Sequence, residues 1–366
     1  MNIFIVRRNS GFGGAERVAE RIASRFAALY PTTRLWAGEH FHGKTIPGRS
    51  GPPWWRSLRF TRHLDRLHLR EDRNSAVFSL EYGPDCDIYR AGDGVHSLNV
   101  QRRFRGSRRW MLNPWHWIAP MLERKGLESA RVVIANSNLV KSLLSQTYPH
   151  LAHKVVTIYN GFDPALFSPT TQTKTSVRTA LGLPASGTML LLSGSGFVRK
   201  GLHHCLELLN HLRQQPGYGD AFLVVIGKGD AQPFNAQIQA LNLAQCVHFR
   251  GAIDNPQDYY HAADFMVLPT RHDPFSNSCL EALACGCPVI TSAENGAAEV
   301  ITADTGFIFE GRYDATEFAA AVQFIRECRT PAATIAQSVA HLTADAEFAQ
   351  YLELVTTIHR EKQTAP

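Results

Sequence analysis

The stretch LLLSGSGFVRKGLHHCLELL, residues 190–209, joins an apolar run to a glycine-rich turn and then to a helical pattern. Leucines recur at the spacing of one helix face from Leu202 to Leu212, which predicts an amphipathic helix that begins near Gly201. A buried strand that leads through a glycine turn into a helix is the repeating unit of an α/β fold. The stretch therefore predicts a parallel sheet covered by helices.

Two cations, Arg199 and Lys200, stand in this turn. The start of a helix already exposes unpaired N–H groups and a partial positive charge. Two further positive charges at such a place predict a ligand with more than one negative charge, such as a pyrophosphate. The alternative is a solvated surface turn that binds nothing.

The same alternation of short apolar segments and helical patterns extends along the chain in both directions. The segments that read as strands are residues 2–6, 76–80, 87–91, 132–135, 155–158, 189–193, 222–226, 265–269 and 288–291. Continuously apolar strands that alternate with helices predict parallel sheets with both faces covered.

A stretch rich in Pro, Gly and Thr at residues 159–176 reads as a linker. We therefore expect an α/β protein of two Rossmann-like domains that face a central cleft. The first domain would span residues 1–165 and the second residues 166–340, and a helical segment at 341–366 would pack back toward the first. Ligands of such sheets bind beyond the carboxyl ends of the strands, so the cleft is the expected site.

Length and composition agree with a globular enzyme of more than one domain. The chain has 366 residues, 44% of them hydrophobic and 19% charged. It contains no apolar run long enough to span a membrane, and its start lacks the order of a signal peptide, so we expect a cytosolic protein. The seven cysteines show no regular spacing. For Cys285 and Cys287, which lie in an apolar run, buried packing is favoured over metal or redox chemistry.

Charge is distributed unequally between the two halves. Residues 1–166 contain 25 Lys and Arg against 13 Asp and Glu, a net charge of +12, whereas residues 167–366 contain 13 against 19, a net charge of −6. All six tryptophans lie in the first part. The first domain is therefore expected to face an anionic partner.

Two other glycine-rich segments follow predicted strands. In SGFGGAER, residues 10–17, Gly11, Gly13 and Gly14 would let backbone N–H groups approach a ligand. Glu16 stands where the dinucleotide fingerprint has its last glycine, so this fingerprint is weakly supported, and a tight turn without ligand is the alternative. The second segment, VIGKGD, contributes Gly227.

The segment RHDPFSNSCLEALACGCPVIT, residues 271–291, carries two acids eight positions apart, Asp273 and Glu281. A helix is expected to begin near Ser276, where its amides can bind hydroxyls or anions. Glu281 on that helix can accept two hydrogen bonds from a ribose diol. The alternatives are that Asp273 only caps the helix and that Glu281 only forms a structural ion pair.

Together these segments resemble the retaining GT-B glycosyltransferases of glycosyltransferase family 4. The family pattern E-P-F-G…LEA-x-A-x-G-x-P-V-I reads here as DPFSNSCLEALACGCPVI, and the family's GGAER stands intact at residues 13–17. SGSGFVRKG is similar to the phosphate clamp of the lipopolysaccharide core glucosyltransferase I subgroup. YRAGDGVHSLN at residues 89–99 is similar to that subgroup's Ala-Ala-Asp segment, with Asp93 in the place of the aspartate.

The resemblance implies a donor site and a catalytic group. The implied nucleotide-sugar-binding residues are Gly13, Gly14, Arg199, Lys200, Gly227, Asp273, Phe275, Ser276, Asn277 and Glu281. The clamp cations would neutralise the charge that grows on the leaving pyrophosphate, and Asp93 would act near the reacting centre, with His96 as a weaker alternative. Asp273 in place of the family's Glu and Ser276 in place of its Gly would alter which sugar is accepted.

The implied activity is a retaining, metal-independent transfer of a hexose, with UDP-glucose the favoured donor, to a lipopolysaccharide-core or related glycolipid acceptor. No cofactor is implied. The sequence Asp85-Cys86-Asp87 matches a D-x-D metal signature, but it lies in the wrong domain for that role. The alternatives are a family 4 transferase that uses another UDP- or GDP-sugar in capsule or exopolysaccharide synthesis, a nicotinamide dehydrogenase, and a non-enzymatic binder of nucleic acid or an anionic surface. Nucleic acid is not the expected partner.

The segment QRRFRGSRRWMLNPWHWIAPMLERK, residues 101–125, combines cations with aromatic and aliphatic residues. Cations attract anionic headgroups and tryptophans favour the headgroup boundary, so the segment predicts peripheral docking on the inner face of a membrane. The alternatives are a solvated helix with its tryptophans in the core, and direct binding of acceptor phosphates. The residues assigned to the acceptor or membrane are Arg17, His96, Arg102, Arg103, Arg105, Arg108, Arg109 and Trp110.

Overall fold

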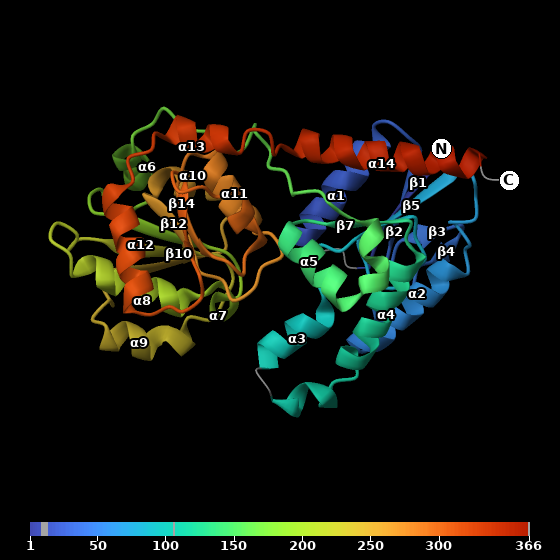
Figure 1. The fold of residues 1–366 in the computed structure, drawn as a ribbon, viewed down its shortest axis with the longest axis horizontal. Coiled ribbons are helices and arrows are strands. Elements are labelled where there is room, and N and C mark those ends of the chain that lie inside the picture. The colour runs from blue at the N-terminus through green and yellow to red at the C-terminus, as the bar shows by residue number, and fades with distance from the viewer. Residues whose placement is uncertain (9–13, 105–106, 365–366) are drawn as a thin grey trace. The chain divides into compact units, whose positions relative to one another are not determined.

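A computed structural model describes residues 1–8, 14–104 and 107–364 of the chain (Figure 1). The chain forms two compact units. The first contains Met1–Tyr159 together with Asp345–Pro366, and the second contains Asn160–Ala344. The sequence placed the corresponding boundaries at residues 165 and 340, so the structure divides the chain within a few residues of them.

The first unit is built on a six-stranded parallel sheet with the strand order β2-β1-β5-β6-β7-β8. Beside it lies a short antiparallel pair, β3-β4. The strands are β1 (Asn2–Arg7), β2 (Thr32–Trp36), β3 (His40–Phe41), β4 (Lys44–Thr45), β5 (Ser75–Ser79), β6 (Ile88–Arg90), β7 (Val132–Ala135) and β8 (Val155–Thr157). The helices are α1 (Gly14–Ala27), α2 (Pro53–Asp65), α3 (His96–Phe104), η1 (Arg108–Leu112), α4 (Trp115–Ser129), α5 (Asn138–Thr147), η2 (Pro149–Lys154) and α14 (Ala344–Thr364).

Helices cover both faces of this sheet, as parallel strands without polar alternation require. On one face α1 and α14 pack together, with Phe26 and Tyr351 in a common core (Figure 1). On the other face α2, α4 and α5 contribute Phe60, Leu127 and Val140 to a second core.

The last helix of the chain is bonded into the first unit by buried polar groups. Arg90 donates from Nε to the Tyr351 hydroxyl at 2.9 Å. The Lys362 ammonium, 5% exposed, donates to the Asp87 carboxylate at 2.8 Å and to two backbone carbonyl oxygens. Asp87 therefore neutralises a structural lysine, and Asp85 pairs with Lys125 at 2.8 Å, so the D-x-D sequence serves the packing of this unit.

The second unit is built on another six-stranded parallel sheet, with the order β11-β10-β9-β12-β13-β14. Its strands are β9 (Met189–Ser193), β10 (Phe222–Ile226), β11 (Val247–Gly251), β12 (Phe265–Leu268), β13 (Val289–Ser292) and β14 (Gly306–Phe309). Its helices are α6 (Lys174–Ala180), α7 (Phe197–Lys200), α8 (Leu202–Arg213), η3 (Gln232–Phe234), α9 (Asn235–Ala240), α10 (Pro256–Ala262), α11 (Asn277–Ala284), η4 (Gly296–Val300), α12 (Ala315–Glu327) and α13 (Ala332–Ser338).

Each apolar segment predicted as a strand contains a strand of the structure, with bounds that agree to within one residue. The central strands β9, β10, β12 and β13 are buried along their whole length, which is why they read as uninterrupted apolar runs. Cys285 and Cys287 are 5% and 3% exposed, which confirms their expected burial.

Candidate functional site

The glycine turn after β9 depends on backbone conformations that favour glycine. Gly196 and Gly201 have φ values of 79° and 80°, on either side of the single-turn helix α7. A Cβ atom at Gly201 would lie 2.0 Å from the carbonyl oxygen of Pro269, so only glycine fits. The helix that the sequence predicts to begin near Gly201 is confirmed, since α8 begins at Leu202 with Gly201 as its N-cap. Arg199 and Lys200 end α7, and α8 begins after Gly201.

Gly227 brings two strand-end turns together. Its φ is 121°, and a Cβ atom there would lie 2.3 Å from the carbonyl oxygen of Gly194. Gly194 N–H in turn donates to the Ile226 carbonyl at 3.0 Å. The structure therefore gives Gly227 a packing role beside the turn, and its assignment as a ligand-binding residue stays a prediction.

Lys200 forms a buried ion pair with Asp273. Its ammonium donates to Asp273 Oδ2 at 2.7 Å, and the Arg199 guanidinium reaches the same oxygen at 3.2 Å. Lys200 and Asp273 are each 7% exposed, whereas the Arg199 side chain is half exposed. Burial alone would raise the pKa of the Asp273 carboxyl, but the charges of Lys200 and Arg199 outweigh burial and lower the pKa. Two cations and one carboxylate thus leave this cluster with a net positive charge.

Asp273 belongs to an extended segment before α11 and does not cap that helix. It pairs as an isolated bridge with Asn295, and the N-cap of α11 is Ser276. The Ser276 side chain makes no capping bond to α11; its hydroxyl lies 3.0 Å from that of Ser278. The side chain of Phe275 is buried, at 4% exposure.

The beginning of α11 is held by neighbouring loops. Ser276 N–H donates to Asn295 Oδ1 at 3.1 Å. Asn277 Oδ1 accepts from Asn160 Nδ2 at 2.6 Å. The first N–H groups of any helix have no acceptor within the helix, so this end of α11 presents donors that suit hydroxyls or an anion.

Glu281 lies one turn into α11, half buried. Tyr260 on α10 donates from its hydroxyl to Glu281 Oε2 at 3.0 Å, and the Ser193 hydroxyl lies 3.1 Å from the same phenol oxygen. Sequence reasoning missed Tyr260 and Ser193. In the sequence Tyr260 has the position of an ordinary core aromatic of an amphipathic helix, and its partner Glu281 is 21 residues away.

In the first unit, Asp93 is exposed in the turn that follows β6. Gly94 has a φ of 72°, and Asn99 Nδ2 donates to the Asp93 carbonyl at 2.9 Å, so the turn is tied to α3. Beyond the carboxyl end of a parallel strand is where ligands of such sheets bind.

His96, the first residue of α3, is held by a buried acid that the sequence did not single out. Its N–H donates to Glu123 Oε2 at 2.8 Å, and Tyr148 donates to Glu123 Oε1 at 2.8 Å. Burial raises the pKa of Glu123 to about 7. Burial also lowers the pKa of His96 to about 4, with a further contribution from His116, whose ring nitrogen lies 3.2 Å away. His96 is therefore uncharged at neutral pH.

Part of the predicted glycine loop lies outside the described residues. Gly13 belongs to this part, and Arg105 of the basic segment also lies outside the described residues. Gly14 and Arg17 belong to the first turn of α1.

The basic aromatic segment forms the end of α3, η1 and the start of α4. Its apolar side chains are partly turned to solvent: Leu112 is 86% exposed, Trp117 54% and Met121 55%. Trp110 and Trp117 lie with their ring centres 5.3 Å apart, and Trp117 Nε1 donates to the Met111 carbonyl. Arg108 and Arg109 are exposed beside them. The alternative that the tryptophans of this segment all pack in the core is therefore wrong.

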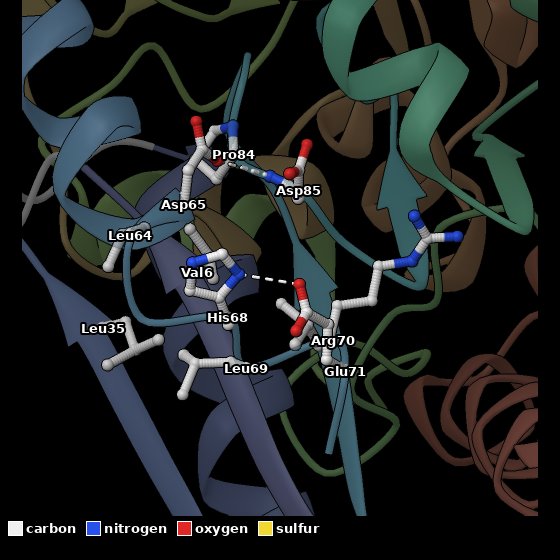
Figure 2. Close-up of a pocket in the computed structure, with 11 residues that line it drawn as sticks. Val6, Leu35, Leu64, Asp65, His68, Leu69, Arg70, Glu71, Pro84 and Asp85 are labelled. Carbon is white, nitrogen blue, oxygen red and sulfur yellow. Dashed lines mark hydrogen bonds and ion pairs between the residues drawn. The ribbon is translucent and has the colours of Figure 1, made fainter. Parts of the chain in front are cut away.

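A cavity of about 110 Å³ lies elsewhere in the first unit, between the end of α2 and β5 (Figure 2). Leu64, Val6 and Leu35 contribute to its apolar wall, and charged residues lie around it. Asp85 N–H donates to Asp65 at 3.0 Å, and His68 lies 2.7 Å from Glu71 (Figure 2). None of the residues predicted for donor or acceptor lines it.

Among the described residues, no three or more His, Cys, Asp or Glu side chains are arranged to hold a metal ion. In the same part of the chain, no helix combines the length and apolar character needed to cross a bilayer.

Two family models together cover most of the chain. Residues 12–166 match Glycosyltransferase Family 4, and residues 173–340 match Glycosyl transferases group 1.

Curated relatives are also glycosyltransferases. Lipopolysaccharide glucosyltransferase WaaG of Escherichia coli is 24% identical over 302 residues, which cover 79% of this chain and 79% of that protein. A D-inositol 3-phosphate glycosyltransferase of Jonesia denitrificans is 29% identical over 48% of this chain and 43% of that protein. The chain spans about half the length of this relative and of three other curated glycosyltransferases of similar identity.

Solved structures show the same fold. The crystal structure of WaaG superposes with a TM-score of 0.77 at 21% identity, covering 97% of this chain and 100% of that one. Anabaena Alr3699/HepE in complex with UDP-glucose superposes with a TM-score of 0.70 at 18% identity, covering 98% and 100%. The expected GT-B architecture of two α/β domains is thus confirmed. The chain belongs to the GT-B glycosyltransferases of family 4, and WaaG is one of its homologues.

Proposed function

We propose that this glycosyltransferase moves a hexose from a UDP-sugar, with UDP-glucose favoured, to a lipopolysaccharide-core or related glycolipid acceptor. The observation that carries the proposal is the arrangement of Arg199, Lys200 and Glu281 around the glycine turn of the second unit. The homology to WaaG supports the acceptor class, and the UDP-glucose complex of a structural neighbour supports the donor class.

On the donor side, the cluster of Arg199, Lys200 and Asp273 would bind the pyrophosphate. Lys200 is already fixed by its buried ion pair, so it needs little reorganisation when negative charge develops on the leaving group. Glu281 would accept the ribose hydroxyls. The reaction would need no metal, because the two cations take over the neutralisation of the diphosphate. It would retain the anomeric configuration, as the resemblance to the retaining transferases of family 4 implies.

Asp273 would affect the binding of the donor sugar indirectly, through the two clamp cations Arg199 and Lys200. Its carboxylate is bound by the two cations that hold the phosphates, so it fixes their positions. Recognition of the sugar hydroxyls would then rest on the backbone of residues 273–277 and on the hydroxyl of Ser276, which stands where the family has Gly. These two departures from the family pattern are the reason that another UDP- or GDP-sugar is the second candidate donor.

On the acceptor side, Asp93 would accept the proton of the attacking hydroxyl or stabilise positive charge on the sugar. It is exposed at a strand end, and its turn is anchored to α3. His96 is less suited to bind a phosphate of the acceptor, because it is uncharged at neutral pH.

The acceptor domain would dock peripherally on an anionic membrane surface. The exposed side chains of Leu112, Trp117 and Met121 stand among the arginines of η1 and the end of α3. Each cation of this kind contributes roughly 1 kcal/mol of binding free energy near an anionic surface. Exposed apolar side chains strengthen the binding because they insert at the headgroup boundary.

A donor screen tests the function. UDP-glucose, UDP-galactose, UDP-N-acetylglucosamine and GDP-mannose are offered with lipid acceptor extracts, and nucleotide release is measured. We expect release from UDP-glucose above all, dependent on the extract and unaffected by a metal chelator. Thermal shifts in the presence of UDP, NAD and an oligonucleotide serve as the control. Stabilisation by NAD or the oligonucleotide without stabilisation by UDP would contradict the proposal.

A further inference from the structure

A chain of hydrogen bonds joins the glycine turn to α11 through a tyrosine. The Tyr260 hydroxyl donates to Glu281 Oε2 at 3.0 Å, and the Ser193 hydroxyl lies 3.1 Å from it. Ser193 is the last residue of β9, directly before the turn that carries the clamp cations. Ser278 in the first turn of α11 donates to the Ser193 carbonyl at 3.1 Å, so the turn is tied to α11 at two points.

Tyr260 is suited to donate to the carboxylate, because its phenol keeps its proton at neutral pH. It is 1% exposed, and burial, with the negative charge of Glu281, raises the pKa of its phenol well above the usual range. Its ring is fixed in the core of α10, whereas a glutamate side chain has several rotatable bonds. A hydrogen bond from a fixed donor selects one rotamer of Glu281.

We propose that Tyr260 is a positioning residue that orients Glu281 toward the ribose of the nucleotide donor. Through Ser193 it also sets the distance between the ribose acceptor and the clamp turn. The inference rests on the proposed function, because it takes Glu281 as the group that binds the ribose. It assigns a role in nucleotide recognition to a buried residue that touches no ligand.

A purely structural role for Tyr260 makes a different prediction. If the phenol only needed a buried acceptor, its loss would lower stability and weaken every nucleotide to the same extent. If it orients Glu281, its loss weakens only those nucleotides that carry ribose hydroxyls. The ratio of the affinities for UDP and for 2′,3′-dideoxy-UDP separates the two roles.

The test measures both affinities by calorimetry for the wild type, Tyr260→Phe and Tyr259→Phe. Tyr259 is the matched control, since it is the neighbouring buried tyrosine of α10 and takes no part in these hydrogen bonds. We expect Tyr260→Phe to weaken the affinity for UDP roughly tenfold, the usual effect of losing a hydrogen bond to a charged group. The affinity for dideoxy-UDP should stay unchanged. Tyr259→Phe should leave both affinities unchanged.

Ser193→Ala is the second variant, which keeps the tyrosine in place if Tyr260→Phe does not fold. It should weaken the affinity for UDP about threefold and leave the affinity for dideoxy-UDP unchanged. Provided that the wild type binds UDP, either of two results would overturn the inference. One is an equal loss of affinity for UDP and for dideoxy-UDP, and the other is an unchanged affinity for UDP in both variants. If the wild type binds neither nucleotide, the proposed function itself fails, and the inference falls with it.

Discussion

At the scale of single residues, the ion pair of Lys200 and Asp273 gives the clamp two separable properties. Lys200→Ala should lower turnover by about a hundredfold or more, because it removes a fixed cation from the place where leaving-group charge develops. It should also lower stability, since Asp273 stays buried with only the half-exposed Arg199 as partner. Steady-state turnover and the melting temperature measure the two effects.

The double variant Lys200→Ala with Asp273→Asn is the control. It removes the uncompensated carboxylate, so much of the lost stability should return while turnover stays low. Near-normal turnover of Lys200→Ala with its native donor would show that the clamp assignment is mistaken.

Asp93 allows a test of the acceptor side by itself. Asp93→Asn keeps the size of an exposed side chain, so the variant should fold normally and bind UDP with unchanged affinity. Transfer should fall by about a hundredfold or more if the carboxylate accepts the proton of the acceptor. Transfer assays and UDP calorimetry on the same preparation decide the matter. Retained transfer by Asp93→Asn would mean that another group accepts the proton of the acceptor.

The sequence indicated several residues of the candidate site but not their partners. Arg199 and Lys200 could be proposed because two cations in a glycine turn suit a ligand with more than one negative charge. Their pairing with Asp273 could not, because the two segments are 73 residues apart and only the strand order brings them together. Tyr260 and Glu123 were missed for a related reason. The sequence pattern of a helix shows on which face a tyrosine or a glutamate lies, but it does not show whether that side chain forms a buried hydrogen bond with a distant residue.

At the scale of elements, α3 is anchored by an acid whose pKa is raised by burial. In the folded state the pKa of Glu123 is about 7, against an ordinary value of 4.5. Between these values the folded state holds a proton on Glu123 that the unfolded state releases, so the contribution of Glu123 to stability falls as the pH rises through this window. The groups that interact with Glu123 include His96, Tyr148, Asp93, Tyr82 and Tyr89.

Glu123→Gln removes this titration and keeps an acceptor for the N–H of His96. The melting temperature of the wild type relative to this variant should therefore decline between about pH 4.5 and pH 7. Calorimetric scans across the window measure it. A difference that stays constant over the window would show that Glu123 titrates normally.

The segment of α3, η1 and α4 gives the test of membrane docking. The wild type should co-sediment with vesicles that contain anionic lipid, less so at high salt, and little with neutral vesicles. Changing Arg102, Arg103, Arg108 and Arg109 to Glu should abolish the binding and leave UDP affinity intact.

A matched control reverses four exposed arginines of the second unit, at Arg250, Arg312, Arg326 and Arg329. It changes the net charge equally but should bind vesicles like the wild type. Equal co-sedimentation of the wild type and the first variant would exclude docking through this segment.

The strands that the sequence did not predict are edge strands or belong to the small pair. β11 is exposed over its second half, and β2 begins with two threonines and an arginine. Edge strands have one side open to solvent, so they carry polar residues and lose the continuous apolar pattern of the central strands. The central strands of each sheet are therefore readable from the sequence, whereas of the four edge strands only β8 is.

At the scale of the whole molecule, the polar bonds of α14 show how strongly the last helix supports the first unit. Lys362→Met should lower the stability of that unit by about 3 kcal/mol, because it leaves the Asp87 carboxylate buried with only more distant arginines nearby. Arg360→Met, an exposed change on the same helix, is the control. Thermal unfolding with and without UDP measures the effect. Equal stability of the two variants would show that the buried pair contributes little.

The return of the chain to its first unit has a consequence for biosynthesis. The chain enters and leaves the second unit side by side, since Phe162 N–H donates to Leu342 and Ala344 N–H donates to Phe162. During translation the second unit is therefore complete before the residues of α14 have been made, and it can fold on the ribosome. The first unit has to wait, because Tyr351 and Val355 of its core are made only after the whole of the second unit. Until then the sheet face beside α1 is uncovered, so synthesis of the first unit begins before that of the second, but the first unit finishes folding after it.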